Sequence, residues 1–495
     1  MFDKLKEVLK RILDISKTID KYKKDTVIQS LPTLTYVNRA KKFIEKNDLV
    51  MAEKILTDAL ELPQKDSLVY KYLGLVYEKT GKFDMAVENY QLSADLNPSD
   101  KNIWQRLGFA LLSGGKFEQS IKSFENADKI QPNNTDTCTG CGMAYMKLRK
   151  YQDAYDKFLK AIAINKYNFS ALFLAAVMEI KLGMYDKADS KLAFLSNVAP
   201  NEGNTFEYAK LKMLRGDFDN AIFYAKKSLG YNSLMLPAYL ILGQLYTKKF
   251  DKDNAIKSFC IAFEKGLKTS QLFYEWGNSL LNFGMYEDAK NKFEQANELQ
   301  NEDSDIMSKL ALCSILLKDF DSAKIYTDKA ASKTNNKTIE LVNAISYYEE
   351  GKYDDSLQKL KSDDENVLNS LYTAKCYAKQ DNFKKASEYF ERTIEQNPCI
   401  KETYIDFTNL LIVKKDYKEA QRKLRKALKY FEDDVDLLNL MFNISYILVK
   451  ADISTYNIKE TLSIANKIEQ MGADLFEYPR QKEELENILS ESERN

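Results

Sequence analysis

The sequence predicts an all-α protein built as a solenoid of about twelve antiparallel helical hairpins, with further helices at both ends. Two observations predict this architecture. Small residues recur about every thirty-four positions, and each is followed twelve positions later by a second small residue. A short period repeated along most of a chain is typical of a stacked array rather than of one globular core.

The small residues have a direct structural interpretation. Two helices that cross closely need small side chains at the crossing, because a larger Cβ substituent would push their backbones apart. The first members of the pairs are Ala40, Gly74, Gly108, Gly142, Ala176, Ala209, Gly243, Gly277, Ala311, Ala344, Ala374 and Thr408. The second members are Ala52, Ala86, Ser120, Ala154, Ala188, Ala221, Ala255, Ala289, Ala323, Ser356, Ala386 and Ala420. Each pair therefore predicts one helical hairpin.

Most units place a turn between the two helices and an aromatic residue at the start of the second, as in Gly81 with Phe83 and Gly284 with Tyr286. Glycine is suited to end the first helix in the left-handed conformation. A large apolar residue usually follows the second small residue by four positions, which returns it to the same helix face. These residues include Tyr90, Phe124, Phe158, Phe259, Phe293 and Phe390.

Two consecutive units carry this pattern most completely. The first consists of Leu73, Gly74, Tyr77, Ala86, Tyr90 and Pro98. The second consists of Trp104, Leu107, Gly108, Ser120, Phe124 and Pro132. Both closely resemble the signature of the tetratricopeptide-repeat family. The resemblance covers residues 33–433 and implies a right-handed superhelical solenoid whose concave surface is lined mainly by the first helices.

The spacing divides the chain into residues 1–32, a solenoid over 33–433, and degenerate capping helices with a charged tail over 434–495. The first segment repeats apolar residues at intervals of three or four among lysines, which predicts an amphipathic helix. We favour capping of the first repeat by this helix. Contact with an anionic membrane surface and self-association are the alternatives.

The period shortens to thirty residues between Ala344 and Ala374, ahead of a charged stretch at 361–364. A tolerated deletion at a turn is the favoured interpretation, and a kink of the solenoid near residues 361–365 is the alternative.

Composition favours a cytoplasmic protein that binds other proteins. The chain has 73 basic and 73 acidic side chains, so no global field attracts nucleic acid. No stretch approaches the roughly twenty apolar residues of an integral membrane helix, and the first residues lack the apolar region of a secretory signal. The six cysteines show no disulfide framework, which agrees with a reducing compartment.

The absence of histidine from the sequence limits the catalytic chemistry that the chain can perform. It excludes Ser-His-Asp and Cys-His mechanisms and histidine-based metal sites. Cys138 and Cys141 are spaced like half of a zinc site, but they occupy the positions of Trp104 and Leu107 in the preceding unit, which are packing positions. We therefore expect no catalytic residue, no metal site and no cofactor, and predict that the protein is not an enzyme.

The candidate binding residues come from the expected concave face, at positions three before, one after and four after the first small residue. In four consecutive units these positions are mostly apolar, and methionines there suit a surface that adapts to its ligand. The predicted peptide-binding residues, named here the apolar strip, are Phe109, Leu112, Met143, Met146, Phe173, Val177, Ile180, Phe206 and Met213. A groove for an amphipathic helix or an extended hydrophobic peptide is favoured, and burial of the strip by tight curvature or a terminal element is the alternative.

The favoured function is a non-catalytic scaffold or adaptor with a protein or peptide ligand. A regulatory or structural subunit of an enzyme or of a secretion or assembly complex is the alternative. Some members of the family grip acidic C-terminal tails through a clamp of Lys, Asn and Arg. Asn278 occupies a suitable position, but Tyr274 stands where the first Lys of the clamp would be, so this ligand is disfavoured.

Overall fold

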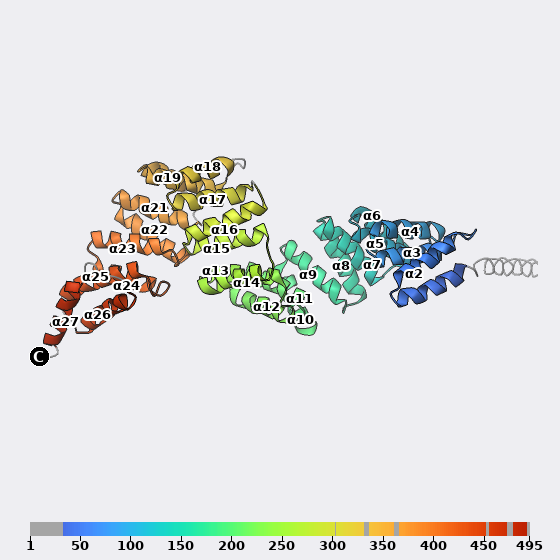
Figure 1. Ribbon diagram of the computed structural model, residues 1–495, viewed down its shortest axis with the longest axis horizontal. Helices are drawn as coiled ribbons and strands as arrows, with labels where there is room; N and C mark the ends of the chain where they lie inside the picture. The colour runs from blue at the N-terminus through green and yellow to red at the C-terminus, as the bar shows by residue number, and fades with distance from the viewer. Residues whose placement is uncertain are drawn as a thin grey trace, which may run out of the picture. The chain divides into compact units, whose positions relative to one another are not determined.

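The computed structural model describes residues 33–301, 303–330, 336–360, 366–451, 455–472 and 479–492 (Figure 1). Within these residues the secondary structure is entirely helical, and helices follow one another in antiparallel pairs. The predicted all-α repeat solenoid is confirmed. The expected helix of residues 1–32 lies outside the described residues, and so does the stretch 361–365, for which a kink was the alternative to a tolerated deletion. The chain forms two compact units, Met1–Arg215 (unit 1) and Gly216–Asn495 (unit 2).

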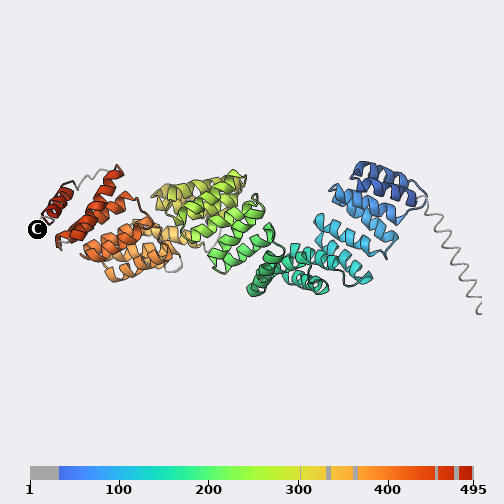
Figure 2. The same cartoon turned by 90° about the horizontal axis from the view of Figure 1, so that it is seen from below.

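Unit 1 is a row of helices in which each packs on its neighbour in chain order, coloured blue to teal in Figure 2. It begins with a helical segment over residues 33–45. Its other helices are α2 (Leu49–Leu60), α3 (Ser67–Lys79), α4 (Phe83–Leu96), α5 (Lys101–Ser113), α6 (Phe117–Ile130), α7 (Thr135–Lys147), α8 (Tyr151–Ile164), α9 (Phe169–Lys181), α10 (Tyr185–Val198) and α11 (Glu202–Leu214). Odd-numbered helices are the first helices of the hairpins, and even-numbered helices are the second.

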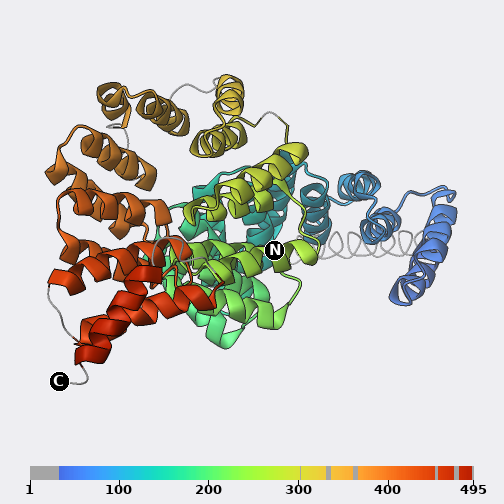
Figure 3. The same ribbon diagram turned by 60° about the vertical axis from the view of Figure 1, so that its left-hand side comes forward.

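Unit 2 continues the alternation, and its curve runs from the green helices through gold to orange in Figure 3. Its first eight helices are α12 (Phe218–Tyr231), α13 (Leu236–Lys248), α14 (Lys252–Glu264), α15 (Ser270–Asn282), α16 (Tyr286–Leu299), α17 (Ser304–Leu316), α18 (Phe320–Ala330) and α19 (Lys337–Glu349). The remainder are α20 (Tyr353–Leu360), α21 (Val367–Lys379), α22 (Phe383–Gln396), α23 (Lys401–Val413), α24 (Tyr417–Ala427), α25 (Val435–Ala451), α26 (Thr455–Gln470) and α27 (Pro479–Ser492). Helices α25–α27 share a buried cluster that includes Phe442, Ile458 and Leu485.

The small residues lie at the helix crossings, as predicted. A Cβ atom added to Gly108 would lie 2.7 Å from the Phe124 ring, and one added to Gly142 would lie 2.6 Å from the Phe158 ring. The Ser120 hydroxyl donates a hydrogen bond to the Gly108 carbonyl oxygen at 2.7 Å. The two small positions of a unit therefore face each other, and the large ring of the second helix packs directly on the first small residue.

The ends of the helices follow local rules. Gly81, Gly115, Gly183 and Gly284 adopt positive φ angles of 71–76°, as their place in the turns predicts. Asn or Asp side chains cap most first helices, because their oxygens accept hydrogen bonds from backbone N–H groups in the first turn. The caps in unit 1 include Asp66, Asp100, Asn134, Asn168 and Asn201. None of the helices in the described ranges is both long and apolar enough to cross a bilayer.

Candidate functional site

The apolar strip lies entirely in unit 1, on four first helices. Phe109 and Leu112 are on α5, and Met143 and Met146 are on α7; the other residues of the strip are on α9 and α11. All nine side chains are half-buried, and none is fully buried or fully exposed. The strip therefore keeps accessible apolar surface while its base packs on the core of the unit.

The packing of unit 1 places the first helices on its concave side. Helices α5 and α7 contact each other directly, as do α7 and α9, and α9 and α11. On the side of the second helices, α4 and α6 flank a cleft of about 620 Å³ whose lining includes Trp104 and Leu111 of α5. A row of helices that meet on one side and separate on the other bends toward the side where they meet.

The first part of the strip lies between α5 and α7. The Phe109 ring packs edge-on against Phe124, with ring centroids 5.0 Å apart and planes at 78°. Phe109 and Leu112 both rest on a buried cluster that contains Phe124 and Cys141. A Cβ atom on Gly140 would lie 2.9 Å from Phe109 and 2.5 Å from Phe124. Gly140 thus makes room for both rings, a role that the sequence interpretation missed.

The middle of the strip lies between α7 and α9. Met143, Met146 and Val177 pack on a second buried cluster, which contains Phe158 and Met178. Tyr145 of α7 is half-buried and packs on both clusters. The first and middle parts of the strip are therefore continuous through Tyr145, which lies one turn along α7 from Gly142 and was not among the predicted residues.

The last part of the strip lies between α9 and α11. The end of the Phe173 ring lies 4.0 Å from the position of a Cβ atom on Gly203, in the first turn of α11. The Lys210 ammonium lies over the Phe206 ring at 5.6 Å and pairs with Glu207 at 2.9 Å. The strip thus meets a charged pair on α11.

Two predicted residues sit near the C-terminal ends of their helices. Ile180 is the next-to-last residue of α9, Met213 is the next-to-last residue of α11, and both are half-buried. They extend the apolar surface along α9 and α11 beyond Val177 and Lys210.

Helix α9, which carries three residues of the strip, also carries a buried carboxylate. Glu179 of α9 has no exposed surface and accepts hydrogen bonds from the Tyr155 hydroxyl at 2.9 Å and the Lys191 ammonium at 2.5 Å. These partners lie on α8 and α10, so the network joins three successive helices. Burial, and then the contact with Glu179, raises the pKa of Tyr155 to about 12. This network was not predictable from the sequence, because Tyr155 and Lys191 lie 24 and 12 residues away from Glu179.

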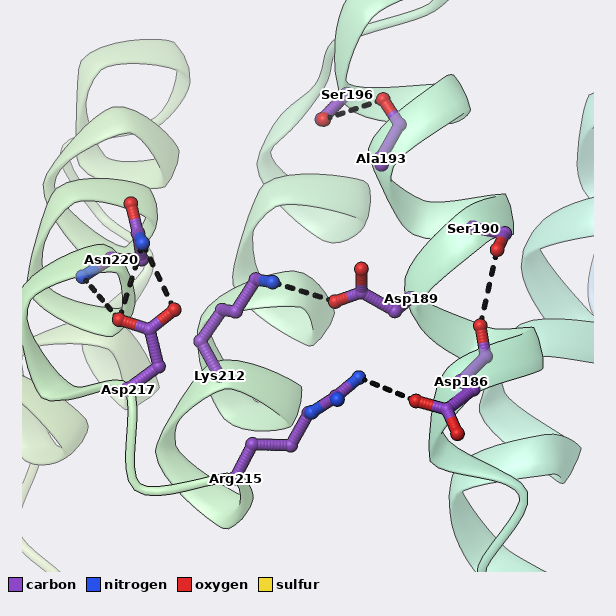
Figure 4. A network of polar contacts seen from close by, with 9 residues as sticks. All are labelled: Asp186, Asp189, Ser190, Ala193, Ser196, Lys212, Arg215, Asp217 and Asn220. Carbon is purple, nitrogen blue, oxygen red and sulfur yellow. Dashed lines mark hydrogen bonds and ion pairs between the residues drawn. The ribbon is translucent and has the colours of Figure 1, made fainter.

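Ion pairs fix the last helix of the strip. The Lys212 ammonium lies 2.7 Å from the Asp189 carboxylate, and the Arg215 guanidinium lies 3.0 Å from Asp186 (Figure 4). Both pairs join α11 to α10. They orient α11 on its neighbour, and with it Phe206 and Met213.

The two closely spaced cysteines are packed in the core, as predicted. Cys138 and Cys141 are each 3% exposed. Burial raises the pKa of both thiols, that of Cys141 to about 11, so they stay protonated and weakly reactive at neutral pH. Across the described residues, no group of three or more Cys, Asp or Glu side chains is arranged to hold a metal ion.

Comparison with known families agrees with this geometry. A family model described as "Psidin, N-terminal TPR repeats region" matches residues 38–199. Two models described as "Tetratricopeptide repeat" match residues 236–264, which span α13 and α14, and residues 369–398, which span most of α21 and all of α22. The chain is a tetratricopeptide-repeat protein. Tetratricopeptide repeats generally mediate protein–protein interactions and are generally not catalytic.

Solved structures that are similar to this tetratricopeptide-repeat chain share little of its sequence. A tetratricopeptide repeat protein from Parabacteroides merdae is 18% identical over 49% of this chain and 98% of its own, with a TM-score of 0.42. A chain of the APC/C hetero-tetramer Cut9–Hcn1 is 12% identical over 91% of this chain and 95% of its own, with a TM-score of 0.45. Pseudomonas aeruginosa pilF is 14% identical over 42% of this chain and 94% of its own, with a TM-score of 0.37. A search of curated proteins found no match.

Proposed function

We propose that the protein is a non-catalytic interaction scaffold and that the apolar strip of unit 1 binds a segment of a partner protein. The observation that carries this proposal is the half-buried state of all nine strip residues on four consecutive first helices. Contiguous apolar surface of this kind commonly marks a protein-binding site. Met143, Met146 and Met213 add side chains that adapt to ligands of different shape.

The dimensions of the strip suit an amphipathic helix or an extended hydrophobic peptide. Packed helices lie about 10 Å apart, so four first helices span roughly 30 Å. A helix of about 20 residues covers that length at 1.5 Å per residue, and an extended segment covers it with about nine residues. The Lys210–Glu207 pair at the α11 end offers a polar contact to one end of such a ligand.

Several features favour a role without catalysis, in the cytoplasm. The sequence contains no histidine, and the balanced charge disfavours nucleic acid as a partner. All six cysteines are free, and five of them are buried, which suits a reducing compartment. Within this proposal the solenoid spans residues 33–433 and the helices of 434–495 cap its far end.

The cleft between α4 and α6 favours a second candidate function, that of a permanent subunit of a larger assembly. The cleft lies on the side of the second helices and combines Val87, Leu92 and Trp104 with polar residues such as Gln91 and Lys122. A permanent subunit would use this cleft as well as the strip, whereas an adaptor would need the strip alone.

The test is an affinity capture from the source cell with the wild-type chain and a Met143→Glu, Val177→Glu double variant, followed by identification of bound proteins by mass spectrometry. Two charges introduced at the half-buried centre of the strip should remove the partner while the circular dichroism spectrum stays unchanged. A Leu92→Glu variant in the α4–α6 cleft is the matched control, since Leu92 is an exposed apolar residue of unit 1.

The outcomes separate the candidates. Loss of partners only in the strip variant supports the adaptor. Loss of the same partners in both variants favours a permanent subunit that uses both surfaces. Retention of every partner by the folded strip variant contradicts the proposal, and unfolding of that variant indicates that the strip is buried.

A further inference from the structure

Unit 2 closes on itself through the connection between α22 and α23. The Asn397 side-chain N–H donates a hydrogen bond of 2.7 Å to the carbonyl oxygen of Asn282, which is 115 residues away in the sequence. The Cys399 sulfur lies 3.9 Å from the Phe250 carbonyl oxygen, and Cys399 packs with Phe283 and Ala255 in one buried cluster. Residues 397–400 therefore lie against the α13–α14 turn and the end of α15.

Beside this contact lies an open cavity of about 550 Å³. First helices α13, α15 and α17 form one part of its wall, and residues 397 and 400 form another. The first turns of α19 and α21 complete the wall with Thr338, Val367 and Leu368. The volume lies within the range of small-molecule sites in proteins, and the positive ends of two helices face this region.

The charge of the described lining has one sign. Lys309 and Lys248 are its only charged residues, and the other polar ones are amides and hydroxyls such as Asn278 and Thr247. Lys309, on α17, is half-buried and lines the cavity. Burial lowers the pKa of Lys309, while Cys313, Asp305 and Glu275 act on it only through longer-range electrostatics that raise it.

The buried Lys375 of unit 2 has ion-pair partners of a kind that the structure does not show for Lys309 within its described residues. The Lys375 ammonium of α21 pairs with the carboxylates of Glu402 and Asp406. Among the described residues, none forms a hydrogen bond or ion pair with Lys309. A desolvated ammonium without a counter-ion costs free energy, and an anion that enters the cavity recovers it.

We propose that this cavity binds a small carboxylate ligand with a short apolar chain, with the Lys309 ammonium as counter-ion and the Asn278 amide as a neutral donor. Lys248 is exposed to solvent, so Lys309 supplies the one partly desolvated ammonium of the lining. One such ammonium balances one negative charge, which suits a carboxylate better than a phosphate dianion. Leu281, Leu312 and Leu368 supply apolar wall for the chain of the ligand. The site lies within unit 2 and is independent of the strip of unit 1.

The test measures binding of hexanoate, hexanamide and inorganic phosphate to the full chain by isothermal titration calorimetry. Hexanoate should bind, and hexanamide, which has the same length but no charge, should bind at least tenfold more weakly. Phosphate should also bind at least tenfold more weakly than hexanoate. This comparison uses the native chain, so it does not depend on the folding of any variant.

Two variants locate the site. Lys309→Met should weaken hexanoate binding by ten- to a hundredfold, in keeping with the loss of a charge-assisted contact. It should also raise the melting temperature without ligand, because a partly desolvated charge is removed. Lys257→Met, at an exposed position of α14, should leave the affinity unchanged. Equal binding of hexanoate and hexanamide, tighter binding of phosphate, or full retention of hexanoate by the Lys309→Met variant would overturn the proposal.

Discussion

Units 1 and 2 use the same helical hairpin but present its first helices differently. In unit 1 the first helices α5, α7, α9 and α11 carry half-buried apolar side chains whose base packs on the core. In unit 2 the first helices line an open cavity with two lysines in its wall, and residues 397 and 400 form another part of that wall. The hairpin geometry is set by the small residues, whereas the remaining positions and the connections decide what the inner face can bind.

The largest expected effect concerns what the two units share. Alanine in place of Gly142 in unit 1 or Gly243 in unit 2 would bring a Cβ atom within 2.6 Å or 2.5 Å of Phe158 or Phe259. Such overpacking should lower the free energy of unfolding of either unit by about 2 kcal/mol, although alanine favours a helix by about 1 kcal/mol over glycine. Urea unfolding followed by circular dichroism measures the loss.

The control for these variants is Gly230→Ala, in α12, where nothing lies within 4 Å of the added Cβ atom. It should stabilise the chain by up to about 1 kcal/mol. Equal stability of the Gly243→Ala variant and the wild type would show that the crossing tolerates a methyl group, contrary to the shared geometry.

The next effect separates the two units. Asn165 and Asn397 both end a second helix and accept a backbone hydrogen bond from two residues further on, but only Asn397 also reaches Asn282. Asn397→Ala should cost about 1–2 kcal/mol, because the buried Cys399 N–H and the Asn282 carbonyl oxygen both lose their partner. Asn165→Ala, at an exposed position, should cost less than about 1 kcal/mol.

Hydrogen exchange followed by mass spectrometry gives the readout for this pair. Asn397→Ala should speed exchange around Phe250 and Asn282, at the closing contact. If exchange there is unchanged, the connection between α22 and α23 does not hold the wall of the cavity in place.

A smaller effect concerns turns that lack glycine. Arg149 and Phe250 both adopt a φ angle of 59°, where a side chain costs about 1 kcal/mol. Arg149→Gly should stabilise unit 1 by up to that amount, since Arg149 is exposed. Phe250→Gly should bring no net gain, because Phe250 packs on the closing cluster with Cys399. Thermal unfolding compares the two, and an equal gain in both would contradict the packing role of Phe250.

The smallest effect depends on pH. Asp319 precedes α18 and accepts hydrogen bonds from Ser322 and from Lys290, which lower its pKa from 3.8 to about 2. Because the folded-state pKa is depressed, this stabilisation is present above about pH 4 and is lost as the pH falls toward 2. Asp319→Asn should therefore flatten the acid limb of a stability curve measured by urea unfolding between pH 5 and pH 2. An unchanged acid limb would assign that limb to other carboxyl groups.

The sequence predicted the hairpins because their determinants are local. The pair Gly108 and Ser120, with Phe124 four residues later, encodes one crossing through steric fit alone, and the structure places all three in contact. The turn glycines, such as Gly115, were equally predictable, since a left-handed turn restricts the choice of residue.

Other features were not predictable because their determinants are distant in the sequence. Closure of unit 2 depends on a contact between Asn397 and Asn282, 115 residues apart, and no periodicity marks it. Glu179 lies on the first helix of its hairpin like its apolar neighbours, and only the arrangement of three helices shows its partners. Gly140 lies between Cys138 and Cys141, whose spacing resembles half of a zinc site. Its steric role in making room for Phe109 was therefore not predicted. The apolar strip itself stays a prediction.

The most direct test of the strip is methyl NMR of the full chain labelled with [13C-methyl]methionine, recorded with and without a partner recovered by affinity capture. The methyl signals of Met143 and Met146 should shift on binding, because both side chains are half-buried on α7 within the strip. Those of Met51 and Met85, on the second helices α2 and α4, should stay in place. Shifts at Met85 with unchanged signals from Met143 and Met146 would contradict recognition through the strip and move the interface to the second helices.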